Sequence, residues 1–409
     1  MTTLTAPEPT DIEPDVTEEE PLGVVSPPEA QETENDLVRV LHVVNGEHFS
    51  GAERVQDLLA LSLPDFGYEV GFATLKQGMF AGQRDSLDAP LHELGMRGKW
   101  DLTVALRLAK IAQEEGYSLL HAHTPRSLLV TFLACHWTKL PFVYHVHSPA
   151  GRDSTRWFAN RVNAQIERAF ARQAKQLITV SPTLTDYMRV LGFPTDNLRC
   201  VLNGVPCLPY DAPGARLRRR PVEPFVVGMV ALFRPRKGAE VLLEAIAALR
   251  SRGHDVRLEA IGPFESEDYE AELHALASKL SLQEAVHWAG FTDDVPGALA
   301  RVDALALPSL FGEGLPMVVL EAMAAGLPVV ATRCEGTSEA ILHRETGLLV
   351  EPGSVSQLTD ALEEVFSGEI DYPEMSIAAR ERHADRFSAE AMAKQVAGVY
   401  SGVLKHAEG

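Results

Sequence analysis

Short apolar runs rich in β-branched residues alternate with longer segments of helical period along most of the chain. This alternation is typical of parallel β-α-β units. The runs of the first half predict six strands, at residues 38–45, 69–75, 119–124, 142–148, 176–181 and 198–204. Those of the second half predict six more, at residues 225–232, 256–262, 285–291, 303–309, 328–333 and 347–352. Several runs are apolar on both faces, which favours sheets covered by helices on both sides.

Two halves of similar pattern indicate two domains. Residues 206–224 between them hold five prolines and four arginines without apolar periodicity, which predicts a surface linker. We therefore expect an α/β fold of two doubly wound Rossmann-like domains that face each other across a cleft, with ligands beyond the carboxyl ends of the strands. The expected divisions are a tail at 1–36, a first domain at 37–207, a linker at 208–223, a second domain at 224–390 and a C-terminal helix at 391–409 that packs back on the first domain.

The acidic charge is concentrated at the amino terminus. The 409 residues include 57 acidic and 37 basic side chains, a formal charge of −20, which argues against a nucleic-acid-binding protein because phosphates require a basic surface. Residues 1–36 hold eleven of the acidic residues, six prolines and no Lys or Arg, so we expect this tail to be disordered. The other 373 residues carry 46 acidic and 37 basic side chains, a formal charge of −9.

Neither a secretory signal nor a membrane-spanning segment is visible, because no stretch offers the roughly 20 apolar residues that a spanning helix needs. We expect a cytoplasmic protein. The cysteines are too few and too irregularly spaced for a disulfide framework or a zinc site, and small buried side chains are expected at all four positions: Cys135, Cys200, Cys207 and Cys334.

The most informative segment is LPSLFGEGLPMVVLEAMAAGLPVVAT, residues 307–332. It predicts a strand, a glycine-flanked loop that carries Glu313, and a helix over about 316–325. Backbone N–H groups of the loop and the positive end of the helix offer a site for a phosphate. Glu321 lies on the otherwise apolar helix, where a buried carboxylate is costly unless a polar group binds it. A ribose or sugar with vicinal hydroxyls is one such partner, and a core carboxylate tied to the backbone is the alternative.

This segment, with Glu313 and Glu321 in a Glu-x7-Glu spacing, resembles the donor-site signature of the family 4 glycosyltransferases, retaining enzymes of the GT-B fold. The resemblance extends from about Leu41 to Tyr400. Further matching motifs are FSGAERV (49–55), ITVSPTL (178–184), VLNGV (201–205), RPRKG (234–238), AGFTDDVPGALARVDALALPS (289–309), EGTSEAI (335–341) and GLLVEPG (347–353).

The resemblance implies a retaining glycosyltransferase of the hexosyltransferase type. Its donor would be a UDP- or GDP-sugar, bound by the second domain. Its acceptor would be a hydroxyl of a glycan or lipid-linked sugar, held by the first domain, in polysaccharide, glycolipid or cell-envelope glycan synthesis.

The resemblance also implies roles for single residues. Glu321 would hold the ribose hydroxyls, and Glu313 would lie beside the transferred sugar with backbone N–H groups of Gly314 and Leu315. Lys237 would contact the leaving diphosphate, a role that suits a compact ammonium. Its alternative, a solvated lysine at a helix start, is disfavoured because a cation there opposes the helix dipole.

The first-half loop HFSGAE contains a glycine that also bears on phosphate binding. By resemblance Gly51 lets the backbone of this loop approach a phosphate. A simple strand-to-helix turn is the alternative at this position.

The segment before Lys237 departs from the family pattern. The family has Gly-Arg five to six residues earlier, where this chain has Ala231 and Leu232. Arg234 or Arg236 would have to supply the second cation from the same loop, and we rank Arg234 first.

Four histidines lie in pairs at the ends of two predicted strands: His121, His123, His145 and His147. At i, i+2 spacing the members of a pair point the same way, so a metal site has to be considered. No Asp or further His follows at a strand end to complete it, and no metal or other cofactor is expected to be required. By resemblance His147 is instead the cleft histidine near the transferred sugar and the acceptor. His145 is then packed in its strand, and the roles of His121 and His123 stay open.

Residues 152–175 predict a basic amphipathic helix, with five arginines and one lysine against two acidic side chains. Such a helix can contact a membrane surface or an anionic acceptor, which predicts a peripheral position at the inner face of the membrane. A helix packed on the sheet with a solvated arginine face is the alternative.

Two other functions are alternatives to this one. A Rossmann-type dehydrogenase needs Gly-x-Gly-x-x-Gly after the first strand, and NGEHFSG has the wrong spacing. A non-catalytic nucleotide-sugar-binding protein keeps the fold without the chemistry, and Leu232 in place of the family arginine gives it some weight.

Overall fold

The computed structural model describes residues 37–49, 51–98, 101–148, 157–209 and 222–406. The acidic tail predicted at 1–36 lies outside these ranges, as do most of the linker predicted at 208–223 and the first part of the basic helix predicted at 152–175. The chain from Leu37 on forms one compact unit.

Seven parallel strands form the first sheet, in the order β3-β2-β1-β4-β5-β6-β7. They are β1 (Val38–Val44), β2 (Tyr68–Thr74), β3 (Leu91–Glu93), β4 (Leu119–Ala122), β5 (Phe142–Val146), β6 (Gln176–Thr179) and β7 (Leu198–Cys200). The central β1 pairs with β2 on one side and with β4 on the other, which is the doubly wound arrangement. From Val40 on, β1 is fully buried, as expected of a strand covered on both faces.

Helices connect these strands. They are α1 (Gly51–Ser62), η1 (Leu63–Phe66), α2 (Phe80–Gln83), α3 (Thr103–Glu114), α4 (Pro125–Thr138), α5 (Trp157–Phe170), η2 (Ala171–Gln173), α6 (Pro182–Val190) and η3 (Thr195–Asn197), where η marks a 3-10 helix. A capping box starts α4: the Thr124 hydroxyl accepts from the N–H of Ser127, and the N–H of Thr124 donates to Ser127 Oγ. This cap satisfies N–H groups that the first helical turn leaves free, so α4 begins directly after β4.

The second sheet has six parallel strands in the order β10-β9-β8-β11-β12-β13. They are β8 (Phe225–Val230), β9 (Val256–Ile261), β10 (Val286–Gly290), β11 (Ala304–Leu307), β12 (Val329–Thr332) and β13 (Leu348–Val350). The helices of this part are η4 (Pro235–Lys237), α7 (Ala239–Ser251), α8 (Glu267–Lys279), α9 (Val295–Leu299), α10 (Met317–Ala325), α11 (Thr337–Ala340), α12 (Val355–Ser367), α13 (Tyr372–Arg386) and α14 (Ala389–Lys405).

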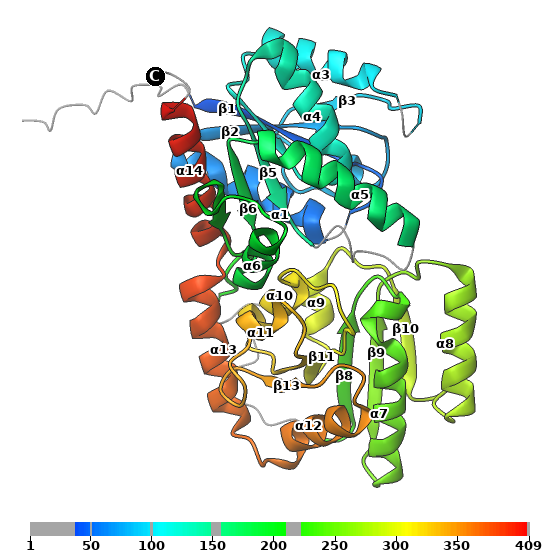
Figure 1. The fold of residues 1–409 in the computed structure, drawn as a ribbon. Coiled ribbons are helices and arrows are strands. Elements are labelled where there is room, and N and C mark those ends of the chain that lie inside the picture. The colour runs from blue at the N-terminus through cyan, green and yellow to red at the C-terminus, as the bar shows by residue number, and fades with distance from the viewer. Residues whose placement is uncertain (1–36, 50, 99–100, 149–156, 210–221, 407–409) are drawn as a thin grey trace, which may run out of the picture. The chain divides into compact units, whose positions relative to one another are not determined.

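The last helix, α14, packs against segments that are distant from it in sequence. In Figure 1 the chain runs from α13 into α14, and α14 packs against α1 and η1. Its Tyr400 is fully buried, and the phenol oxygen lies 2.9 Å from His42 Nε2 on β1 and 2.6 Å from His121 Nδ1 on β4. A buried phenol usually finds such partners because an unpaired hydroxyl would be costly.

Each of the twelve predicted strands overlaps an observed strand, and the predicted architecture of two doubly wound parallel sheets is confirmed. The sequence missed β3, a three-residue edge strand (Leu-His-Glu) that has no apolar run to reveal it. The predicted domain boundaries stay predictions. Within the described ranges, every helix falls short of the length or the apolar character needed to span a bilayer.

Candidate active site

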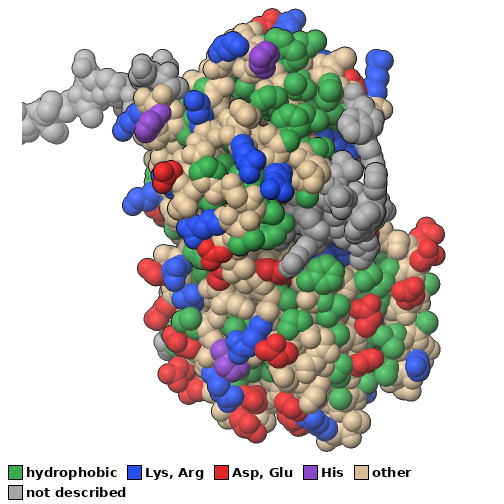
Figure 2. Space-filling model, in the orientation of Figure 1, with side chains coloured by type: hydrophobic (Ala, Val, Ile, Leu, Met, Phe, Trp, Pro, Cys, Tyr) green, Lys and Arg blue, Asp and Glu red, His purple; other side chains and the backbone are tan. Residues whose placement is uncertain are grey.

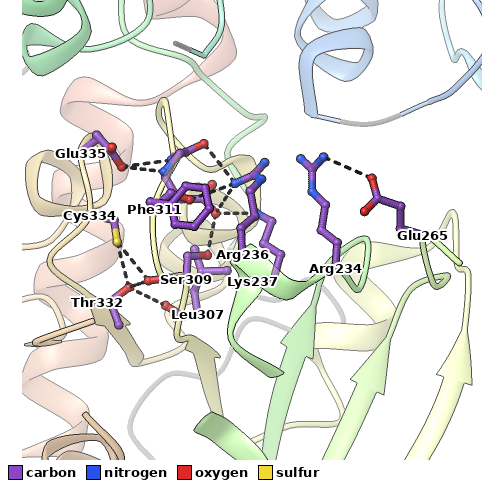
Figure 3. A network of polar contacts seen from close by, with 12 residues as sticks. Arg234, Arg236, Lys237, Glu265, Leu307, Ser309, Phe311, Thr332, Cys334 and Glu335 are labelled. Carbon is purple, nitrogen blue, oxygen red and sulfur yellow. Dashed lines mark hydrogen bonds and ion pairs between the residues drawn. The ribbon is translucent and has the colours of Figure 1, made fainter. Parts of the chain in front are cut away.

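Glu313 is the centre of a buried polar network at the carboxyl end of the second sheet. Its side chain is 6 % exposed, and its Oε1 accepts hydrogen bonds from Lys237 Nζ at 2.5 Å and from Ser309 Oγ at 2.6 Å. The guanidinium of Arg236 lies 3.4 Å from the same oxygen. Figure 3 shows these cations and Ser309 turned toward one another. The residues come from the loops that follow β8 and β11, which are neighbouring strands of the sheet.

The charges of this network keep Glu313 ionised. Burial by itself would raise the pKa of the Glu313 carboxyl, but Lys237 and Arg236 outweigh burial and lower that pKa to about 2. Burial also lowers the pKa of Lys237, which Glu313 opposes and Arg236 reinforces. An ion pair is therefore held in place before any ligand arrives, in a position where the lysine can meet an anion.

The two arginines of this loop are placed differently. Arg236 is 7 % exposed, and its Nη1 donates to the backbone oxygens of Phe311 at 3.3 Å and Gly312 at 3.0 Å. Arg234 points instead toward Glu265, with 3.9 Å between the charged groups (Figure 3). The structure thus brings Arg236, and not Arg234, into contact with Glu313. The ranking of Arg234 for the donor site stays a prediction.

Glu335 occupies part of the loop that the sequence analysis assigned to an anionic phosphate. Its Oε2 accepts hydrogen bonds from the backbone N–H groups of Gly312 at 3.0 Å and Glu313 at 3.2 Å. Sequence reasoning missed this residue, although it begins the EGTSEAI motif. Its neighbour Cys334 donates to the oxygen of Ser309 at 3.0 Å, so the segment after β12 is tied to the loop after β11.

Glu321 is a buried carboxylate on the apolar helix α10. It is 9 % exposed, and its Oε1 lies 3.1 Å from Arg54 Nε but has no aligned hydrogen bond among the described residues. Burial raises the pKa of Glu321, and the charge of Arg54 opposes that shift. The structure therefore does not tie Oε1 to the backbone but pairs it with Arg54. A buried oxygen without a hydrogen bond calls for a polar partner.

The three remaining backbone positions named from the sequence differ in their surroundings. A Cβ on Gly314 would lie 2.0 Å from the carbonyl oxygen of His147, so only glycine fits there. Leu315 is 3 % exposed, and its carbonyl accepts from Asn203 Nδ2 at 2.9 Å. At Gly51, the first residue of α1, a Cβ would make only ordinary contact, 3.5 Å from a Met317 carbon.

His147 follows β5 and is half-buried. Its Nε2 lies 3.1 Å from Nδ1 of His123, and burial lowers the pKa of His147 to about 3, so the ring is neutral near pH 7. His145 is fully buried beside it. The structure adds His42, which the sequence analysis did not single out. In the sequence His42 is a single histidine in an apolar strand, which gives no indication of a site. Its place in the cluster follows from the sheet, where it pairs in register with His121.

Comparisons with known proteins agree with the fold and the motifs. The family model "Glycosyl transferases group 1" matches residues 217–382, and "Glycosyltransferase Family 4" matches residues 49–207. The chain is 26 % identical over 357 residues to an MMP alpha-(1->4)-mannosyltransferase of Mycolicibacterium hassiacum, which covers 86 % of this chain and 79 % of that protein. It is 28 % identical over 309 residues to a D-inositol 3-phosphate glycosyltransferase of Corynebacterium glutamicum, covering 70 % and 73 %.

A similar solved structure is that of Anabaena Alr3699/HepE in complex with UDP and glucose. It superposes with a TM-score of 0.77 at 23 % identity, over 89 % of this chain and all of that one. The two parallel sheets, the motifs and these matches define the class of protein as a glycosyltransferase of the GT-B fold. The chain belongs to the family 4 glycosyltransferases.

Proposed function

We propose that this glycosyltransferase moves a sugar from a UDP- or GDP-sugar to an acceptor hydroxyl, with retention at the anomeric carbon and without a metal. The acceptor is a glycan or lipid-linked sugar of polysaccharide, glycolipid or cell-envelope glycan synthesis. One observation carries the proposal: Glu313, already paired with Lys237, shares a loop-helix segment with Glu321, a buried carboxylate whose Oε1 has no hydrogen bond among the described residues. The similarity to the mannosyltransferase of Mycolicibacterium hassiacum and to the D-inositol 3-phosphate glycosyltransferase of Corynebacterium glutamicum supports a glycosyl donor.

The donor nucleotide is assigned to the end of α10. Vicinal ribose hydroxyls can donate to the Glu321 carboxylate and so supply the hydrogen bonds that its Oε1 lacks. The diphosphate then lies toward Lys237, with Arg234 as the second cation. Arg234 lies on the same loop as Lys237, and its planar guanidinium suits a phosphate.

The transferred sugar is assigned to the space beside Glu313, Gly314 and Leu315, with His147 across from them. Gly314 lies against the carbonyl of His147, so the loop of Glu313 and the segment after β5 adjoin the same place. Gly51 contributes backbone on the side of α1, where a Cβ built on it would lie 3.5 Å from a carbon of Met317 at the start of α10. The roles of all these residues follow the family resemblance.

Leaving-group stabilisation is the main source of rate. As the bond from the anomeric carbon to the phosphate oxygen breaks, negative charge grows on the diphosphate. The Lys237 ammonium is already fixed by Glu313 and needs no reorganisation at that moment. In a site from which water is excluded, one such group contributes about 10²–10³-fold.

Retention is best explained by same-face transfer. Glu313 is a poor covalent nucleophile, because its Oε1 is engaged by Lys237 and Ser309 and its pKa is lowered to about 2. The acceptor oxygen instead bonds to the anomeric carbon on the face from which the diphosphate departs, through an oxocarbenium-like state. The acceptor proton passes to the departing phosphate oxygen, so no protein base is required.

The test is donor binding by the Glu321→Gln variant. We expect a UDP- or GDP-sugar to raise the melting temperature of the parent protein, since a ligand of the native state stabilises it by mass action. Glu321→Gln should lose about tenfold or more in donor affinity, because the amide accepts fewer hydroxyl hydrogen bonds than the carboxylate. Glu284→Gln, at an exposed glutamate before β10, is the matched control and should bind the donor as the parent does.

Transfer is measured with the same proteins and a radiolabelled donor. Release of labelled sugar to an acceptor or to water supports the enzyme. Binding of intact donor without any release would favour a non-catalytic nucleotide-sugar-binding protein, and equal donor affinity in the Glu321 and Glu284 variants would overturn the ribose assignment.

Location at the inner face of the membrane is a further part of the proposal, and it rests on the basic helix read over 152–175. The last turns of α5 belong to it and carry exposed Arg168. Sedimentation with vesicles of anionic lipid, against vesicles of neutral lipid, tests it. Binding that neither salt nor lipid charge affects would contradict an electrostatic contact.

A further inference from the structure

Five imidazoles gather where β1, β4 and β5 reach their carboxyl ends. This histidine cluster consists of His42, His121, His123, His145 and His147. Four of the rings are at most 3 % exposed, and His147 is half-buried. Parallel strands bring their carboxyl ends to one edge of the sheet, so pairs that are 24 residues apart in sequence become neighbours in space.

The nitrogen atoms of the cluster are unevenly satisfied. The Tyr400 hydroxyl is hydrogen-bonded to His42 Nε2 and His121 Nδ1. His123 Nε2 lies 3.2 Å from His42 Nδ1, and His123 Nδ1 lies 3.1 Å from His147 Nε2. Neither ring nitrogen of His145 has a hydrogen-bond partner among the described residues, and Nδ1 of His147 and Nε2 of His121 have none either. Buried ring nitrogens without a partner are uncommon, which indicates that something else is bound there.

The separation of the nitrogens suits a metal ion. One ligand atom from each of His123, His145 and His147 lies within 4.8 Å of the others. Two nitrogens on a tetrahedral zinc ion, each 2.0–2.1 Å from it, lie about 3.3 Å apart. The pair His123 Nδ1 and His147 Nε2, at 3.1 Å, is already close to that value.

We propose that His123, His145 and His147 bind a divalent ion of the imidazole-preferring class, for which Zn²⁺ is the probe, with the fourth position open beside His147. Three neutral imidazoles are a ligand set that zinc accepts, and an open fourth position takes water or another small ligand. Because His147 is half-buried while the other two rings are buried, an ion can enter from its side. In the sequence the histidines form two pairs on separate strands, a pattern that disfavours a metal; β4 and β5 are neighbours in the sheet and bring the pairs together.

A bound ion would inhibit the enzyme. This step rests on the proposed function, in which the His147 ring lies beside the transferred sugar and transfer needs no metal. An ion that holds a nitrogen of His147 removes it from the sugar and places a positive charge next to an oxocarbenium-like centre. Both effects raise the barrier to transfer.

A second set of three rings competes for the assignment. His42, His121 and His123 also present ligand atoms within 4.8 Å of one another. These rings are at most 3 % exposed, and Tyr400 already bonds one nitrogen of His42 and one of His121. An ion there would place two charges in the core with no open side, which is costly. The first set is therefore assigned.

The experiment is a titration of the full chain, freed of any affinity tag and of metal, with Co²⁺ followed by visible absorption and then with Zn²⁺ in competition. We expect one equivalent of Co²⁺ with the absorption of a tetrahedral ion, displaced by Zn²⁺. His145→Phe keeps a ring of similar shape without nitrogens and should weaken binding by tenfold or more. His42→Phe, the matched control in the same cluster, should bind as the parent does.

The outcomes separate the possibilities. Binding that survives in His145→Phe, binding that is lost in His42→Phe alone, or no stoichiometric binding to the parent each overturns the proposal. If His145→Phe fails to fold, judged by its circular dichroism and melting temperature, the His147→Gln variant at the half-buried position replaces it and should also lose the absorption band. Transfer by the metal-free parent tests the proposed function separately, and Zn²⁺ should reduce that transfer in the parent but not in His145→Phe.

Discussion

Buried polar groups beside the two parallel sheets are held in opposite charge states. In the second-sheet region (residues 224–390), Glu313 is ionised, with its pKa lowered to about 2 by Lys237 and Arg236. In the first-sheet region (residues 37–207), burial instead favours the neutral forms of the histidine cluster and of Glu167. Burial raises the pKa of Glu167 to about 7, with only a Tyr144 hydroxyl at 2.7 Å to oppose it. The difference shows that burial by itself does not set the charge of a carboxyl; the cations beside it do.

The overall charges of the two regions reinforce the contrast. Residues 37–207 hold 18 basic and 15 acidic side chains, whereas residues 224–390 hold 13 basic and 28 acidic ones. On the face drawn in Figure 2, acidic side chains are accordingly more numerous over the second-sheet region. The region assigned to the anionic donor is therefore the acidic one, so donor affinity must come from a few fixed cations rather than from the general field.

Removal of Lys237 should have the largest effect. Lys237→Ala is expected to slow transfer by about 10²–10³-fold, because the leaving diphosphate loses its fixed cation while Arg236 and Ser309 still hold Glu313. The turnover number at saturating donor is the measurement. Lys279→Ala, at the exposed end of α8, is the control and should turn over like the parent. Equal turnover in the two variants would remove Lys237 from the mechanism.

Glu167 should give the next largest effect, on stability. Between pH 4.5 and about 7 the folded state keeps the Glu167 proton and the unfolded state does not, so stability falls as the pH rises through this range. Glu167→Gln keeps a hydrogen-bonding side chain without the charge. It should be more stable than the parent above pH 7, by on the order of 3 kcal/mol.

Urea unfolding of Glu167→Gln at pH 5 and pH 8 measures this difference. Glu114→Gln, on the exposed surface of α3, is the control and should follow the parent at both values. Glu313→Gln should show the opposite sign: its carboxylate adds stability above pH 4.5 that is lost as the pH falls toward about 2. Parallel pH profiles for the two carboxyl variants would contradict the contrast between the regions.

The smallest expected effect distinguishes the two arginines. Arg234→Gln should raise the KM for the donor by about tenfold, because a phosphate contact is lost. Arg236→Gln should instead lower the melting temperature, because it breaks hydrogen bonds to the carbonyls of Phe311 and Gly312. A raised KM in Arg236→Gln with none in Arg234→Gln would reverse the ranking.

Much of the fold was determined by the local pattern of the sequence. Period-two and period-3.6 apolar patterns specify which face of each segment is buried, and they predicted the strands except for β3, whose three residues carry no such pattern. The motif around Glu313 and Glu321 is local in the same sense, because one strand, one loop and one helix present both carboxylates.

Contacts between distant segments were decided only by the tertiary structure. Glu335 reaches the loop of Glu313 because β12 lies beside β11, and Arg236 reaches it because β8 does. His42 meets His121 through the pairing of β1 with β4, and Tyr400 joins them from 279 residues beyond His121. Apolar periodicity specifies that a strand is buried but not which strand lies next to it. The order of strands in the sheet, set by packing of the whole chain, therefore determined which polar side chains meet.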